Sequence, residues 1–154
     1  MKLNIKDLRI SSPAFEPLTR IPDRYTSKGE NISPPIAWTG VPTNTQQLVL
    51  ICYDPDAPLA RGFTHWLVYG IPPDVNAIGE GGGSRFTEGI NSIESIGYTG
   101  PAPPPGHGLH HYYFWLYTLD TALDLAPGLD RERLLDRIAP HIIEQARSIG
   151  TYEL

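Results

Sequence analysis

The chain has 154 residues, of which 40% are hydrophobic and 19% are charged, and its formal net charge is −5. This acidic balance argues against a general nucleic-acid binder, because binding to phosphate backbones requires clustered cationic side chains. The single cysteine excludes an internal disulfide and is typical of a reducing compartment, so we expect a cytoplasmic protein. No stretch is apolar for long enough to span a bilayer, and we expect a single domain over residues 1–154.

The first third of the chain predicts two strands separated by turns. Residues 3–10, LNIKDLRI, alternate apolar and polar side chains, as a half-buried strand does. Residues 11–45 are rich in proline, glycine, serine and asparagine, which favour turns. Residues 48–53, LVLICY, are apolar throughout and predict a strand that is buried on both faces. Cys52 lies inside this strand, so we expect a buried, unreactive thiol rather than a nucleophile.

Two more strands are predicted in the middle of the chain. Residues 65–71, HWLVYGI, and residues 110–119, HHYYFWLYTL, are rich in the aromatic and β-branched side chains that favour sheet. Between them, the glycine-rich residues 79–85 predict a flexible loop. These runs favour a fold made mostly of β-strands.

A helical pattern appears near the C-terminus. Asp130 can cap a helix over residues 131–138, RERLLDRI, which carries its leucines and isoleucine on one face. Pro140 is expected to kink or interrupt this helix before it continues into residues 141–147, HIIEQAR. Residues 148–154 predict a short terminal strand.

Polar side chains stand at the ends of three of the apolar strands. Asp54 follows the strand at 48–53 and precedes Pro55, which cannot donate to a sheet ladder. His65 and His110 open the other two strands. Because side chains alternate along a strand, His110 and Tyr112 lie on the same face. If these strands are neighbours, their polar ends converge on one pocket with an apolar wall.

Each of these features also has a structural interpretation. Asp54 and Asp56 in DPDAP can form an Asp-Pro turn whose carboxylates accept hydrogen bonds from nearby N–H groups. A single histidine at a strand end can be a satisfied structural residue. Residues 101–105, PAPPP, can be a PxxP peptide ligand, but this short segment abuts strands and suits a rigid pocket wall better. The coincidence of polar residues at three strand ends favours a functional site.

Several segments together resemble the phosphatidylethanolamine-binding protein (PEBP) family, and most closely its bacterial and archaeal branch, which is often described as Raf-kinase-inhibitor-like. They are YDPDAP at 53–58, THWLVYGIP at 64–72 and GYTGPAPPPGHGLHHYYFWLYTLD at 97–120. SKGENISPPIAWTGVP at 27–42 and GTYEL at 150–154 also resemble family segments. The resemblance therefore covers nearly the whole chain.

The resemblance implies a mostly β fold: a PEBP-like antiparallel β-sandwich with one or two short helices near the C-terminus. It also implies a small cavity for phosphate-like anions or phospholipid head groups, and it implies no cofactor and no metal. A homodimer is plausible from the bacterial branch, whereas kinase inhibition cannot be carried over. The residues that the resemblance places around the cavity are Asp54, Asp56, His65, Pro104, His110 and Tyr112.

Two function classes follow from this set of residues. In the first, the protein is a binding or regulatory module, and two cationic imidazoles and the Tyr112 hydroxyl donate to the oxygens of a phosphate group. The alternative is an enzyme that uses the Asp, His and Tyr residues for acid–base chemistry on a small anionic substrate, although the sequence contains no convincing nucleophile. A metal site is disfavoured, because His110 and His111 point to opposite faces of one strand.

Overall fold

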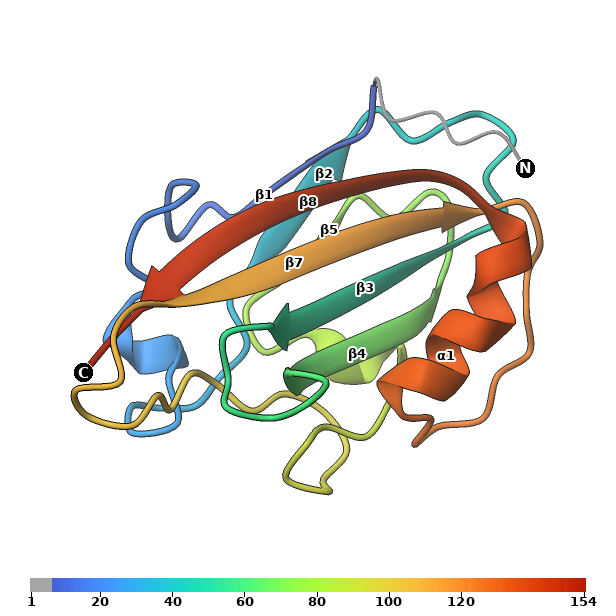
Figure 1. Cartoon of the computed structure of the whole chain (residues 1–154). Helices are drawn as coiled ribbons and strands as arrows, with labels where there is room; N and C mark the ends of the chain where they lie inside the picture. Colours follow the sequence, from blue (N-terminus) through green and yellow to red (C-terminus); the bar gives the residue numbers. More distant parts are fainter. Residues whose placement is uncertain (1–6) are drawn as a thin grey trace.

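The computed structural model describes residues 7–154, which form two antiparallel sheets and one α-helix (Figure 1). The larger sheet has five strands in the order β6-β4-β3-β7-β8. In that order they are Thr87–Glu88, Phe63–Ile71, Gln47–Asp54, His110–Leu119 and Ile142–Tyr152. The smaller sheet has three strands in the order β1-β2-β5, which are Arg9–Ser11, Ile36–Thr39 and Ala77–Ile78.

The larger sheet is covered on both faces. Leu50 on β3 belongs to a hydrophobic cluster shared with Trp38 of the smaller sheet. Its neighbour Ile51 points the other way, into a second cluster with Leu134 and Ile138 of the helix α1 (Arg131–Ile138). Because successive side chains alternate between the faces, β3 must be apolar throughout to be buried on both. The predicted β-sandwich and the predicted double burial of this strand are both confirmed.

Cys52 is part of the cluster between the two sheets, where it is 2% exposed. Burial raises the pKa of its thiol well above the usual value, and the negative charge of Asp54 adds to this effect. The thiolate is therefore suppressed, which agrees with the predicted structural role.

The three strands predicted within residues 48–119 match the structure closely, and the predictions before residue 45 do not. The short strand predicted over residues 148–154 is part of a longer strand, β8, which begins at Ile142 and ends at Tyr152. Residues 110–119 form β7 with the predicted bounds, and β4 begins at Phe63, two residues before the prediction. Half of the strand predicted over residues 3–10 lies outside the described residues, and β1 begins only at Arg9. The turn-rich region contains β2, which the prediction missed although Ile36 and Trp38 alternate with polar or small neighbours.

The C-terminal region contains one confirmed helix and one wrong prediction. Helix α1 has the predicted bounds, and the Asp130 carboxylate accepts a hydrogen bond from the Arg133 N–H at 2.8 Å. The helix does not continue past Pro140: residues Ala139–His141 form a 3-10 turn, and Ile142 begins the long strand β8. Strand β8 pairs with β7 along its whole length, and this pairing outweighs the helical pattern of residues 141–147. A second short 3-10 turn, Gly83–Arg85, lies within the segment predicted to be a flexible loop.

Candidate functional site

The central position of β3 brings three polar strand ends together. Strand β3 lies between β4 and β7 and runs antiparallel to both, so its last residue lies beside the first residues of its neighbours. Asp54 is the last residue of β3, His65 is the third residue of β4, and His110 is the first residue of β7. Tyr112 follows on the same face of β7 as His110, as the alternation predicts.

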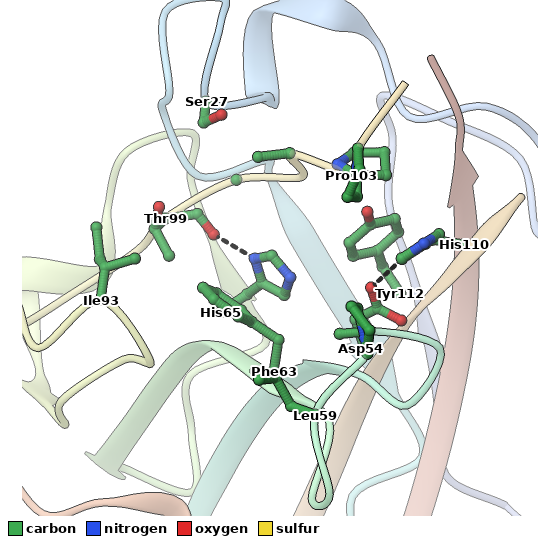
Figure 2. A pocket seen from close by; sticks show the side chains of 15 residues that line it. Ser27, Asp54, Leu59, Phe63, His65, Ile93, Thr99, Pro103, His110 and Tyr112 are labelled. Carbon is green, nitrogen blue, oxygen red and sulfur yellow. Dashed lines mark hydrogen bonds and ion pairs between the residues drawn. The ribbon is translucent and has the colours of Figure 1, made fainter. Parts of the chain in front are cut away.

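These four side chains line one cavity of about 420 Å³, and Pro104 forms part of its wall (Figure 2). All four polar residues are at least nine-tenths buried. Much of the remaining wall is apolar, and it includes Leu59, Phe63, Ile93 and Pro103. A small, mostly apolar cavity with a few convergent polar groups is the usual form of a small-molecule site. Five of the six residues singled out from the sequence thus surround one space.

Asp56 does not line this cavity, and its predicted place needs correction. The Asp54 Oδ1 accepts a hydrogen bond from the Asp56 N–H at 2.7 Å, and this turn directs the Asp56 side chain elsewhere. Asp56 Oδ2 instead accepts bonds from the His111 N–H at 2.8 Å and from its Nδ1 at 2.7 Å. Burial raises the pKa of Asp56, but the hydrogen bonds from His111 outweigh it and hold the pKa below its usual value.

Asp54 and His110 form a buried pair in the cavity wall. His110 Nδ1 donates to Asp54 Oδ2 at 2.5 Å, and each residue is 2% exposed. With its other oxygen the carboxylate holds the turn at Asp56. Asp54 therefore has the structural role that an Asp-Pro turn implies, and it also fixes the orientation of the His110 ring.

His107 contacts this pair, which the sequence did not reveal. Its Nδ1 lies 2.6 Å from the Nε2 of His110, so both nitrogens of His110 are engaged. His107 is exposed and sits between Gly106 and Gly108, whose φ angles are +76° and +97°. The only hint of this contact in the sequence is the pair of glycines that flank the histidine. Glycines allow a loop to fold back on the strand that follows it, but they do not by themselves predict which side chain it will contact.

His65 is held as a neutral imidazole. Its Nδ1–H donates to the Thr99 carbonyl at 2.7 Å, which leaves a lone pair on the other ring nitrogen, Nε2. Figure 2 shows that this Nε2 faces the space between His65, Asp54 and Tyr112. Burial lowers the pKa of His65 to about 4; the Thr99 bond opposes this shift, and His110 adds to it. At neutral pH His65 is thus a hydrogen-bond acceptor and not the cation that the sequence suggested.

Tyr112 supplies a hydroxyl group to the same space. Its ring packs edge-on against His65, with the ring centroids 5.1 Å apart. The hydroxyl has no hydrogen-bond partner among residues 7–154. Burial raises the pKa of Tyr112, and the charge of Asp54 raises it further, so the hydroxyl stays protonated. The cavity therefore offers one free hydroxyl and one imidazole acceptor to a ligand.

Neither a metal cluster nor a membrane-spanning helix is found in the described part of the chain. Within residues 7–154, no group of three or more His, Cys, Asp or Glu side chains is placed to hold a metal ion. Within the same residues, no helix is long and apolar enough to cross a membrane. What these residues do contain is a β-sandwich with a cavity of about 420 Å³ at the ends of three inner strands of its larger sheet.

Comparison with known proteins shows the family to which the chain belongs. The family model for phosphatidylethanolamine-binding protein matches residues 11–153. A UPF0098 protein of Methanothermobacter thermautotrophicus is 44% identical over 151 residues, which cover 94% of this chain and 98% of that protein. The chain belongs to the PEBP family.

Two solved structures agree with this assignment. The PEBP homologue CT736 of Chlamydia trachomatis superposes with a TM-score of 0.90 at 38% identity, covering 96% of this chain and 98% of that one. YbcL of Escherichia coli, described as a member of the mammalian PEBP family, also gives a TM-score of 0.90, at 25% identity and with 96% and 99% coverage. The predicted bacterial and archaeal branch of the family is thereby confirmed. At a coarse level, membership supports a binding or regulatory protein.

Proposed function

We propose that this protein is a binding or regulatory protein whose cavity holds a small phosphate-like anion or a phospholipid head group. The observation that carries the proposal is the convergence of Asp54, His65, His110 and Tyr112 on one cavity of about 420 Å³ with a largely apolar wall. Hydrogen bonds made in such a water-poor space are stronger than in bulk water, so few polar groups are enough to fix a ligand.

Each polar group has a place in this proposal. The Tyr112 hydroxyl donates to a phosphate oxygen, and the His65 Nε2 accepts from a donor on the ligand. The ammonium of an ethanolamine head group pairs with Asp54 or lies against an aromatic face, which contributes about 0.5–2 kcal/mol. Phe63 and Tyr112 supply such faces beside His65.

Replacing His110 with alanine tests the proposal. The change removes the partner of Asp54 and leaves a buried carboxylate uncompensated beside the ligand, so the affinity for phosphoethanolamine should fall roughly ten- to a hundred-fold. Calorimetric titration at a pH of about 6 measures this loss, and circular dichroism verifies that the variant is folded.

The matched control is His141→Ala. His141 also pairs with an aspartate, since its Nδ1 lies 3.1 Å from Asp120 Oδ1, but that pair lies beyond the opposite end of β7. Its loss should leave affinity unchanged. Equal losses for the two variants, or no loss for His110→Ala, would refute the shared cavity as the binding site.

The Asp54–His110 pair supports a second candidate function. A carboxylate that orients an imidazole through Nδ1 is the arrangement that prepares a general base in many enzymes. Cys52, the one cysteine, is buried in the core and cannot serve as the nucleophile, so any reaction would use water or a substrate hydroxyl. Turnover of phosphomonoesters, with and without added divalent metal, distinguishes an enzyme from a binding protein.

We also infer a cytoplasmic protein that can assemble as a homodimer. The single cysteine, which lies buried in the core, supports a reducing compartment, and the dimer rests on the resemblance to the bacterial branch of the family. Light scattering coupled to size exclusion measures the assembly, and fractionation of cells that express the native gene measures the location.

A further inference from the structure

The two buried imidazoles of the cavity have already committed their N–H groups. His65 Nδ1–H donates to the Thr99 carbonyl at 2.7 Å, and His110 Nδ1–H donates to Asp54 at 2.5 Å. Figure 2 shows both contacts and shows that they belong to opposite walls of the cavity. A neutral imidazole carries only one N–H, so His65 has no second one to offer to a ligand.

Of the two remaining ring nitrogens, only that of His65 is open to a ligand. His65 Nε2 faces the cavity with a lone pair, as shown above. His110 Nε2 lies 2.6 Å from His107 Nδ1, a distance at which one of the two nitrogens must carry the shared proton. Whichever of the two carries the proton, His107 engages the Nε2 of His110, so this nitrogen is not offered to a ligand.

From these contacts we infer that the cavity selects anions that bring their own hydrogen-bond donor, such as a singly protonated phosphate monoester, over proton-free anions of the same shape and charge, such as a sulfate ester. The inference deepens the proposed function, on which it rests, and it assigns to His65 the discriminating role.

The selection has a simple physical cause. The P–OH of a singly protonated phosphate monoester donates to His65 Nε2 while another oxygen accepts from the Tyr112 hydroxyl. A sulfate ester has oxygens only, and one of them would face the Nε2 lone pair with no hydrogen between them. Two buried acceptors that face each other make no hydrogen bond, and neither recovers the cost of losing its bonds to water. Sites that are built to bond a hydrogen of the ligand therefore reject analogues that lack this hydrogen.

Several titratable groups surround the ligand space and affect any pH profile. Strand β4 contributes His65, and β3 contributes Asp54 at its end. Strand β7 contributes His110 and Tyr112, and the loop before it contributes His107. Protonation of any of these changes the affinity for every anion, so a single ligand cannot test the inference.

Phenyl phosphate and phenyl sulfate form a matched pair of probes. At a pH of about 5.5 both are mainly monoanions of the same shape, because the second pKa of a phosphate monoester is about 6. They then differ by one proton. Calorimetric titration of the wild-type protein should give phenyl phosphate roughly ten- to a hundred-fold the affinity of phenyl sulfate.

A pH series separates the ligand proton from the protein groups. Above a pH of about 6 the monoester loses its proton, so the preference for phenyl phosphate over phenyl sulfate should shrink by about tenfold per pH unit. While both esters are monoanions, below a pH of about 6, changes in the charge of the protein act alike on both ligands and largely cancel in this ratio. A ratio that stays constant or grows with pH would overturn the inference.

The variant His65→Gln tests the assigned residue. A glutamine amide can donate as well as accept, so the preference should fall to within a few-fold. The control is His111→Ala, whose side chain bonds Asp56 outside the cavity and whose loss should keep the preference intact. If His65→Gln does not fold, the pH series decides.

The outcomes for the inference and for the proposed function are distinct. Equal affinity of the wild-type protein for phenyl phosphate and phenyl sulfate at a pH of about 5.5 would overturn the selection while leaving anion binding intact. Failure to bind phosphoethanolamine or either phenyl ester at any pH would overturn the proposed function itself.

Discussion

At the scale of single residues, the site depends on which nitrogen of each histidine is engaged. Thr99 fixes His65, and Asp54 fixes His110. His107 then occupies the second nitrogen of His110, so a line of contacts runs from a buried carboxylate through a buried imidazole to an exposed one. The exposed end of this line is the part of the site that can respond to solvent.

His107→Ala is expected to broaden the range of anions that bind. Without its partner, the Nε2 of His110 is open to the ligand, and an N–H at this nitrogen can donate to it. The affinity for phenyl sulfate, which brings no donor, should therefore increase several-fold at acidic pH, and more than the affinity for phenyl phosphate. Calorimetric titration of both esters measures the change, with His111→Ala as the control; loss of affinity for both esters would contradict the role given to His107.

The residues that the sequence revealed are those placed by strand periodicity. Asp54, His65, His110 and Tyr112 lie where a buried strand ends or begins, and alternation alone places His110 and Tyr112 on one face. Asp56 was misplaced, because its direction is set by a turn bonded to the Asp54 side chain. His107 was missed for a related reason: its position depends on two glycine φ angles that local pattern does not fix.

At the scale of elements, local signals were enough to predict α1 but not β8, whose conformation depends on pairing with another strand. The α1 helix follows from a cap and an apolar face within a few residues of each other. Strand β8 begins with residues that also suit a helix, and it becomes a strand because β7 offers its backbone groups along ten residues, from His110 to Leu119. Since that partner is distant in the sequence, no local pattern could show the outcome.

Asp130→Ala tests the local signal that specifies α1. The carboxylate satisfies an N–H in the first turn of the helix, and losing such a cap typically destabilises a protein by about 1 kcal/mol. Urea unfolding should show this decrease in the free energy of unfolding. Asp136→Ala, an exposed site on the same helix, should change it by less than about half as much; equal effects would mean that the cap contributes nothing specific.

At the scale of the whole molecule, the cavity exists because of the sheet order. Strands β3 and β4 are joined by a short connection, but β3 and β7 are far apart in the chain and meet only through their pairing. Asp54 and His110 contact each other across that pairing. The ligand space is therefore a property of the assembled sheet, and no single segment contains it.

This dependence on the β3–β7 pairing makes the cavity a reporter of folding kinetics. Non-local strand pairing is slow, because the entropy of closing a long loop must be lost before the contacts form. A ligand that needs both strands in place stabilises the native state but not the transition state for folding, in which the two strands have not yet paired. Saturating phosphoethanolamine should therefore slow unfolding in stopped-flow experiments and leave the refolding rate unchanged, with a total stabilisation of about 2.7 kcal/mol at roughly 100 times the Kd. Faster refolding would instead mean that β3 and β7 have already met in the transition state, and that the cavity is among the first parts of the protein to form.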